Sequence, residues 1–113
     1  MARLASRMAG YRVVRRETFK GIRWKRQNRL WHEKYTRTDP RFSAACKLDW
    51  SRVLKRPDTR HSDGRQLGIV ARDLGAARVV YFVVYVKRNG FLNVISIRYA
   101  ETDEEHAFFR HFP

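Results

Sequence analysis

The sequence predicts an α+β domain in which two N-terminal helices pack on an antiparallel sheet of about four to five strands, followed by a short C-terminal helix. Helix-like patterns occupy the first half, whereas the second half carries strand-forming runs separated by tight-turn signals. Helices followed by strands in this order are typical of the α+β class. A length of 113 residues fits one domain with one core.

Residues 1–16 contain five arginines and no acidic residue. Such a segment is typical of a transit-type presequence, and it is equally typical of a flexible basic arm. In both cases it lies outside the core. We expect a basic arm over residues 1–17 and a single domain over residues 18–113.

The first two elements expected after the arm are a short strand and a basic helix. Residues 18–24 favour an edge strand, because Phe19 and Ile22 are apolar while Gly21 weakens the interior. Residues 25–35 favour a helix that is basic around most of its surface. The remaining side of this helix carries Trp24, Asn28, Trp31 and Tyr35 at helical spacing.

A second helix is expected to begin at Asp39-Pro40 and to run to about Trp50. An aspartate followed by proline matches a helix N-cap with proline at the first helical position. Cys46 falls on the apolar side of this helix, which favours a small buried core residue over a nucleophile. Because it is the only cysteine, we expect no internal disulfide, no cysteine-based zinc site and a reducing, cytoplasmic setting.

The second half opens with a hairpin around an Asp63-Gly64 turn, between residues 58–61 and a returning strand over residues 66–72. Pro57 makes the stretch that follows it a poor central strand, because proline lacks the N–H that a ladder needs. The longest apolar run, residues 79–86, has only the length of a strand. We therefore expect no membrane-spanning helix.

The strongest strand signal is a hairpin over residues 79–99, whose Asn89-Gly90 pair suits a type I′ turn. Pairing residue 88 with residue 91 places Tyr85 opposite residue 94 and Tyr81 opposite Arg98. The face expected to form the core carries Val80, Phe82, Val84, Val86, Ile95, Ile97 and Tyr99. The face expected to be open carries Tyr81, Val83, Tyr85, Lys87, Leu92, Val94, Ser96 and Arg98.

The chain is expected to end in a short helix. Thr102 with Glu105 three residues later matches a capping box, and the acidic residues 103 and 104 complement the positive start of a helix. Arg110 and His111 suit its negative end. These acidic residues are therefore better explained as a helix start than as catalytic acids.

The net charge of +14 is concentrated in residues 1–60, which hold 18 Lys and Arg against 5 Asp and Glu. Arginines interleaved with aromatics favour nucleic acid as the partner, although a merely solvated basic surface is the alternative. We expect Lys25, Arg26 and Arg29 to follow a phosphate backbone, with Trp31 and His32 available for stacking. The open sheet face adds Tyr81 to this nucleic-acid-binding set.

No glycine-rich phosphate loop, His-Glu-x-x-His helix or serine nucleophile context is present. The chain does carry the side-chain types that cleave a phosphodiester without metal, which are cations for the phosphate charge and groups that transfer protons. These candidates are Arg60, His61, Tyr85, Lys87 and Arg98. Plainer roles exist for each: a turn contact for His61, an ion pair with Glu101 or another acid for Arg98, and ordinary packing for the tyrosines.

Three blocks within residues 53–110 carry a recognisable order and spacing: Asp-Thr-Arg-His-Ser-Asp-Gly at 58–64, Val-Tyr-Phe-Val-Val-Tyr-Val-Lys-Arg at 80–88 and Val-Ile-Ser-Ile-Arg-Tyr-Ala at 94–100, with Glu105 beyond. Together they resemble the BrnT family of toxins from bacterial type II toxin-antitoxin pairs, which belong to the RelE-like group. The basic helix after Trp24 resembles the opening helix of the family. Lys25 replaces its usual acid, and Arg65 stands where an acidic residue is common.

The resemblance implies a RelE-like fold, RNA cleavage that arrests translation, and no metal or cofactor. It also implies a ribbon-helix-helix antitoxin of BrnA type that binds operator DNA. Carried onto matching positions, it points to Arg60, His61 and Arg98, and also to Tyr85 and Lys87. Two alternatives stay open: a non-catalytic nucleic-acid-binding protein, and a degenerate toxin that acts only in a DNA-binding repressor complex with its antitoxin.

Overall fold

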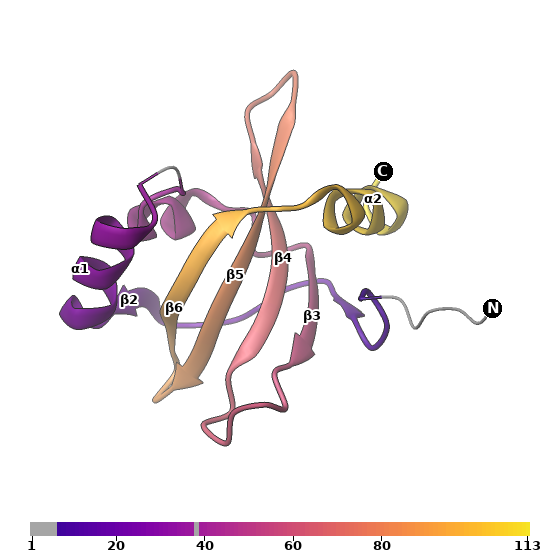
Figure 1. The fold of residues 1–113 in the computed structure, drawn as a ribbon. Helices are drawn as coiled ribbons and strands as arrows, with labels where there is room; N and C mark the ends of the chain where they lie inside the picture. The colour runs from indigo at the N-terminus through magenta and orange to yellow at the C-terminus, as the bar shows by residue number, and fades with distance from the viewer. Residues whose placement is uncertain (1–6, 38) are drawn as a thin grey trace.

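The computed structural model describes residues 7–37 and 39–113, which form an α+β domain with a six-stranded mixed sheet and short helices (Figure 1). The strand order is β1-β3-β4-β5-β6-β2. In chain order the elements are β1 (Arg12–Val14), β2 (Gly21–Trp24), α1 (Arg26–Tyr35), the 3-10 helix η1 (Phe42–Lys47), β3 (Val53–Pro57), β4 (Gln66–Asp73), β5 (Arg78–Arg88), β6 (Phe91–Tyr99) and α2 (Thr102–His111).

The β5–β6 hairpin forms around the expected turn. Asn89 and Gly90 both have positive φ, at 54° and 82°, as a type I′ turn requires. Residue 88 pairs with residue 91, and Tyr85 lies opposite Val94, so the register next to the turn is confirmed.

A β-bulge changes the register further along this hairpin. Tyr85 pairs with Val94, but the preceding Val84 pairs with Ser96, which leaves Ile95 as the extra residue of β6. Beyond the bulge Arg98 lies opposite Phe82, and Tyr81 lies opposite residue 99. The expected pairing of Tyr81 with Arg98 is therefore wrong, and Arg98 lies on the other face of the sheet from Tyr81.

The main core lies on the face that was expected to be open. Alternation along β5 could not decide between its two faces, because both are mostly apolar. Large side chains of the first half of the chain, such as Trp50 and Phe42, pack on this face and exclude water from it. Its buried residues include Phe42, Trp50, Val70, Tyr81, Val83, Tyr85, Leu92, Val94 and Ile97.

The opposite face of the sheet is only partly covered. Helix α2 packs over one end of it through Ala107, Phe108 and Phe112. Phe82, Val84 and Ser96 lie in the uncovered middle and are half-buried. Figure 1 shows this middle region between α2 and α1, with α1 beside β6 and β2. We call this surface the open face.

Part of the segment expected to be a basic arm belongs to the sheet. Residues 12–14 form the edge strand β1 against β3, and Glu17 is buried, so packing begins before the domain boundary expected at residue 18. Residues 1–6 of that arm lie outside the described residues. The edge strand expected over residues 18–24 is present as β2, which pairs parallel to β6 and makes the sheet mixed.

Helix α1 is confirmed, but the second helix is a short 3-10 turn, and Arg41 rather than Asp39 precedes it. Cys46 on this turn is exposed rather than buried. The first strand of the hairpin expected over residues 58–61 lies earlier: β3 ends at Pro57 and pairs with β4, and residues 58–65 connect the two strands. The capping box of α2 uses Glu101 and Glu104, one residue before the expected pair.

Along residues 7–37 and 39–113, no helix combines the length and the apolar character that crossing a membrane requires.

Candidate functional site

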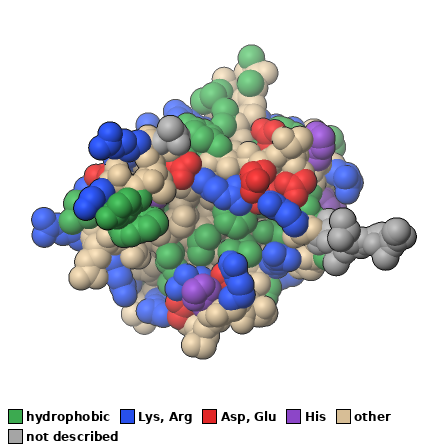
Figure 2. All heavy atoms as spheres, viewed as in Figure 1, with side chains coloured by type: hydrophobic (Ala, Val, Ile, Leu, Met, Phe, Trp, Pro, Cys, Tyr) green, Lys and Arg blue, Asp and Glu red, His purple; other side chains and the backbone are tan. Residues whose placement is uncertain are grey.

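The open face contains a cavity of about 670 Å³ between the N-terminal segment, the loop after β3 and the start of α2. Figure 2 shows hydrophobic side chains at the floor of this hollowed face, with basic, acidic and histidine side chains around its rim. We call it the open-face cavity. The side chains that give it chemical character are Arg7, Tyr11, Arg56, Asp58, Arg60, Phe82, Arg98 and Glu104.

Arg98 is held on the floor of this cavity by the residue opposite it in the sheet. Its guanidinium carbon lies 4.0 Å from the centroid of the Phe82 ring, which is the geometry of a cation–π contact. Its Nη1 and Nη2 donate to the two oxygens of Glu104 at 2.8 and 2.9 Å. Glu104 is buried because the capping box fixes it at the start of α2. The ion pair expected for Arg98 therefore exists, chiefly with Glu104 and more loosely with Glu101 at 3.5 Å.

Arg60 and His61 lie on a turn organised by Asp58. The buried carboxylate of Asp58 accepts bonds from the backbone N–H and from two guanidinium nitrogens of Arg60, at 3.0 to 3.2 Å. These bonds from Arg60 lower the pKa of Asp58 and raise that of Arg60. His61 Nε2 lies 3.9 Å from the same carboxylate, with its side chain 44% exposed. The expected contact of His61 with the Asp63 turn is replaced by this one.

Two further residues of the cavity were missed by sequence reasoning. Tyr11 lies in the segment expected to be an arm, and Arg56 lies in β3, where no strand was expected. The Arg56 guanidinium lies 4.9 Å from the Tyr11 ring centroid and donates to the carbonyl of Ala9. Burial raises the pKa of Tyr11, although nearby Arg56 opposes this, so the group stays a phenol that can donate a proton. No motif in the sequence marked either residue.

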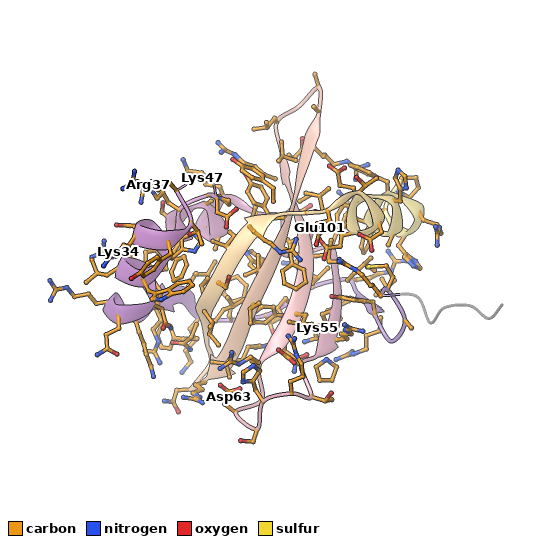
Figure 3. The ribbon with its side chains drawn as sticks, viewed as in Figure 1. Lys34, Arg37, Lys47, Lys55, Asp63 and Glu101 are labelled. Atoms are coloured by element: carbon orange, nitrogen blue, oxygen red, sulfur yellow. The ribbon has the colours of Figure 1, made fainter. Side chains whose placement is uncertain are left out.

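The charge of the cavity favours an anionic ligand. Four arginines face two carboxylates, which leaves a formal excess of two positive charges over a floor that includes Phe82. Guanidinium groups bind phosphate through paired N–H bonds, and an aromatic floor suits a sugar or base. Figure 3 shows Glu101 at the start of α2 and Asp63 in the β3–β4 loop, on two sides of the open face.

Tyr85 and Lys87, the other two catalytic candidates, lie on the opposite side of the sheet. Tyr85 is fully buried in the main core, and its hydroxyl donates to Glu17 Oε2 at 2.7 Å. Lys87 Nζ donates to Glu17 Oε1 at 2.9 Å. The prediction that they share a surface with Arg98 is wrong, because the bulge at Ile95 moves Arg98 to the other face.

These two residues belong instead to a buried ionic cluster around Glu17, completed by Lys55 Nζ at 2.7 Å from Oε2. Burial alone would raise the pKa of Glu17, but bonds from Lys55, Tyr85 and Lys87 outweigh burial and hold it below its ordinary value. Burial and the adjacent carboxylate raise the pKa of Tyr85 far above that of a free phenol. Tyr85 therefore stays protonated and is a structural hydrogen-bond donor.

The expected nucleic-acid-binding residues are divided in the same way. Lys25 and Arg26 are exposed at the start of α1, where they can meet a phosphate backbone. Arg29 is paired with Glu33 at 3.2 Å. Tyr81 is 4% exposed in the main core and is removed from the set. His32 is buried with its Nε2 at 2.7 Å from the Pro40 carbonyl, so it is not available for stacking.

Among residues 7–37 and 39–113, no three His, Cys, Asp or Glu side chains gather in a way that could hold a metal ion. A comparison with known proteins adds no relative: no family model, no curated protein and no solved structure matches this chain.

Proposed function

We propose that the protein is a metal-independent ribonuclease of the RelE-like toxin kind, which cleaves RNA held in the open-face cavity. One observation carries this proposal: Arg60 and Arg98, from two separate blocks of the family resemblance, line one cavity, and His61 follows Arg60 directly. Two guanidinium groups and an imidazole are the groups that metal-free phosphodiester cleavage needs. Tyr85 and Lys87 have no place in the proposed site.

The proposed reaction uses the 2′-hydroxyl of the RNA as the nucleophile. His61 takes the hydroxyl proton, the 2′-oxygen bonds to the adjacent phosphorus, and the bond from phosphorus to the 5′-oxygen breaks. The leaving 5′-oxygen takes up a proton, for which the Tyr11 phenol is the donor within the cavity. Arg60 and Arg98 stabilise the negative charge that builds up on the phosphate. The products are a 2′,3′-cyclic phosphate and a 5′-hydroxyl.

Both arginines are accessible to a phosphate in the cavity. The Arg60 side chain is 78% exposed, so it can leave Asp58 for a phosphate while Asp58 keeps its backbone bond from residue 60. Arg98 is held by Glu104 and Phe82, and 30% of its side chain is exposed to the cavity. A firmly held arginine and an exposed arginine can therefore bind one phosphate from two sides.

The test is cleavage of RNA in EDTA, with and without ribosomes. We expect the wild type to produce cyclic-phosphate ends, and His61→Ala to slow this by about 100-fold or more. Arg60→Ala should lose activity with only a small loss of stability, because the side chain is exposed and Asp58 keeps its bond from the backbone N–H of residue 60. Arg110→Ala, which removes an exposed arginine at the end of α2, is the matched control. Cleavage that EDTA abolishes, or no cleavage under any condition, would overturn the mechanism.

The RelE-like arrangement, the arrest of translation and the ribbon-helix-helix antitoxin belong to the same proposal. They are supported by the three resembling blocks of sequence. Expression of the wild type should arrest growth, and Arg98→Ala should not. A small ribbon-helix-helix reading frame beside this gene should relieve the arrest when it is co-expressed. Equal, harmless expression of wild type and variant would contradict this part.

A non-catalytic RNA-binding protein is the second candidate. The ion pairs of Arg60 with Asp58 and of Arg98 with Glu104 favour it, because they give both arginines a structural role without any reaction. In the same assay this candidate predicts RNA binding that Arg60→Ala weakens, with no cleavage product from any variant.

A further inference from the structure

Helix α1 turns two aromatic side chains to solvent. Trp31 is 61% exposed and Tyr35 is 60% exposed, and their ring centroids lie 5.1 Å apart with a tilt of 47°. Residues four apart share one face of a helix, so the two rings form a single apolar surface. We call this surface the aromatic pair. An exposed pair of this kind marks an interaction surface rather than a core.

The helix face that carries the aromatic pair also borders a hollow beside the sheet. Gln27 and Asn28, one turn before Trp31, line a hollow of about 260 Å³ between α1 and the open face. Val86 and Ile95 form the sheet side of this hollow. Figure 2 shows hydrophobic side chains over α1 on the same side of the molecule as the hollowed open face.

The hollow beside α1 and the open-face cavity lie along one strand. Phe82 lines the cavity and Val86 lines the hollow, and both side chains point to the open face because they are four residues apart on β5. At about 3.3 Å per residue they are roughly 13 Å apart. An extended chain can therefore run from the aromatic pair to Arg60 and Arg98 without leaving this face.

The charges around the aromatic pair fit an anionic partner. Helix α1 contains Arg26, Arg29 and Lys34 against one acid, Glu33. The Lys34 ammonium lies 5.1 Å from the Tyr35 ring centroid. Lys34 and, just beyond the helix, Arg37 project outward (Figure 3). Aromatic rings beside cations are the combination that binds single-stranded nucleic acid, with bases on the rings and phosphates on the cations.

We propose that Trp31 and Tyr35 stack a base of single-stranded RNA whose backbone then crosses the open face to the cavity. This inference rests on the proposed function, and it names the substrate class as single-stranded RNA. Bases in duplex RNA are already stacked on one another and are not free to cover an exposed ring. An apolar partner protein would not use the surrounding cations, so the charge favours RNA as the occupant.

The test measures the affinity of the full chain for a short single-stranded oligoribonucleotide and for the same sequence as a duplex. Trp31→Ala should weaken single-strand binding by about tenfold, as expected for the loss of one stacked base. Trp31→Phe should keep most of the affinity, and Tyr35→Ala should lose part of it. Duplex affinity should not change. Leu74→Ala is the matched control, because Leu74 is also exposed and lies between β4 and β5.

The outcomes separate this inference from the proposed function. Cleavage by the wild type, with Trp31→Ala binding single strands as tightly as Leu74→Ala does, overturns only the stacking of RNA on the aromatic pair. A protein would then be the partner of that surface. Weakened binding by Trp31→Ala, without cleavage by the wild type, supports the stacking of RNA on the aromatic pair and overturns the proposed ribonuclease activity. A wild type with no affinity for single-stranded RNA overturns both.

Discussion

At the scale of single residues, Glu17 joins the N-terminal segment to the sheet. Its carboxylate accepts bonds from Lys55 on β3 and from Tyr85 and Lys87 on β5, inside the main core. A buried charge is tolerated only when its partners replace the lost water, and here three donors do so. Removing the charge of Glu17 should therefore cost more than removing an exposed one.

We expect Glu17→Gln to lower the free energy of unfolding by about 3 kcal/mol, because it leaves two ammonium groups beside a neutral amide. Urea unfolding at neutral pH measures this loss. Glu105→Gln, which removes the same charge at a half-buried position on α2, is the control. A loss no larger than that of the control would contradict a stabilising cluster.

The same carboxylate gives a dependence on pH. The pKa of Glu17 is lower in the folded protein than its ordinary value of 4.5. Its stabilisation is therefore complete above about pH 4.5 and is lost as pH falls through the lower folded value. The stability difference between the wild type and Glu17→Gln should shrink below about pH 4.5. A difference that stays constant down to about pH 3 would rule out this linkage.

A substitution at Tyr85 distinguishes a structural role of this residue from a catalytic one. Because its hydroxyl is buried against Glu17, Tyr85→Phe should lower the free energy of unfolding by about 1 to 3 kcal/mol. Cleavage of RNA at a temperature where the variant is folded should equal that of the wild type. A loss of cleavage comparable to that of His61→Ala would return Tyr85 to the reaction. Tyr99→Phe, on an exposed ring, is the control for both measurements.

At the scale of elements, three local signals of the sequence were reliable, whereas the helix start expected at Asp39-Pro40 and the long-range strand register were not. The turn at Asn89-Gly90, helix α1 and the terminal helix form where local chemistry predicts them. The bulge at Ile95 could not be predicted, because both faces of β5 and β6 are rich in apolar residues and alternation gave no reason to interrupt it. The bulge at this one residue decides which face of the sheet carries Arg98, and therefore which candidate residues lie together.

Strand β4 makes room for the Tyr85 ring by carrying a glycine opposite β5. A Cβ on Gly68 would lie 2.9 Å from Tyr85 Cε1, too close for any real contact. We expect Gly68→Ala to lower the free energy of unfolding by about 1 to 3 kcal/mol through overpacking. At Gly21 the nearest atom is Phe91 Cε1 at 3.4 Å, an ordinary contact, so Gly21→Ala should cost less. Equal losses in thermal or urea unfolding would contradict this explanation.

At the scale of the whole molecule, a net charge of +14 is combined with an open face whose floor is hydrophobic. In the proposed function, this charge attracts RNA at long range, and the open face supplies the aromatic and guanidinium contacts. The net charge is given by the composition. The open-face cavity depends on contacts between the N-terminal segment, the β3–β4 loop and α2, which are distant in the sequence.

RNA affinity should therefore fall steeply with salt, and the slope should identify the residues that contact phosphate. Arg60→Ala should reduce the slope of log K against log salt by about 1, because one phosphate contact is lost. Arg110→Ala should leave the slope unchanged, and Trp31→Ala should weaken binding without changing it. A slope that responds equally to Arg60→Ala and Arg110→Ala would indicate diffuse attraction by net charge instead of a defined phosphate site.

The extra residue at Ile95 reverses the parity of β6, since the side chains from Ser96 onward exchange sides relative to an uninterrupted strand. In a regular ladder that kept every residue of this sequence, the guanidinium of Arg98 would lie in the main core opposite Tyr81, where it would have neither Glu104 nor Phe82 as a partner. Near the end of β6, Ile97 is buried in the main core, and the next residue, Arg98, is accessible on the open face. Removal of Ile95 would make the ladder regular and leave Arg98 opposite Phe82, so the bulge is what lets a strand with this number of residues keep the arginine out of the core.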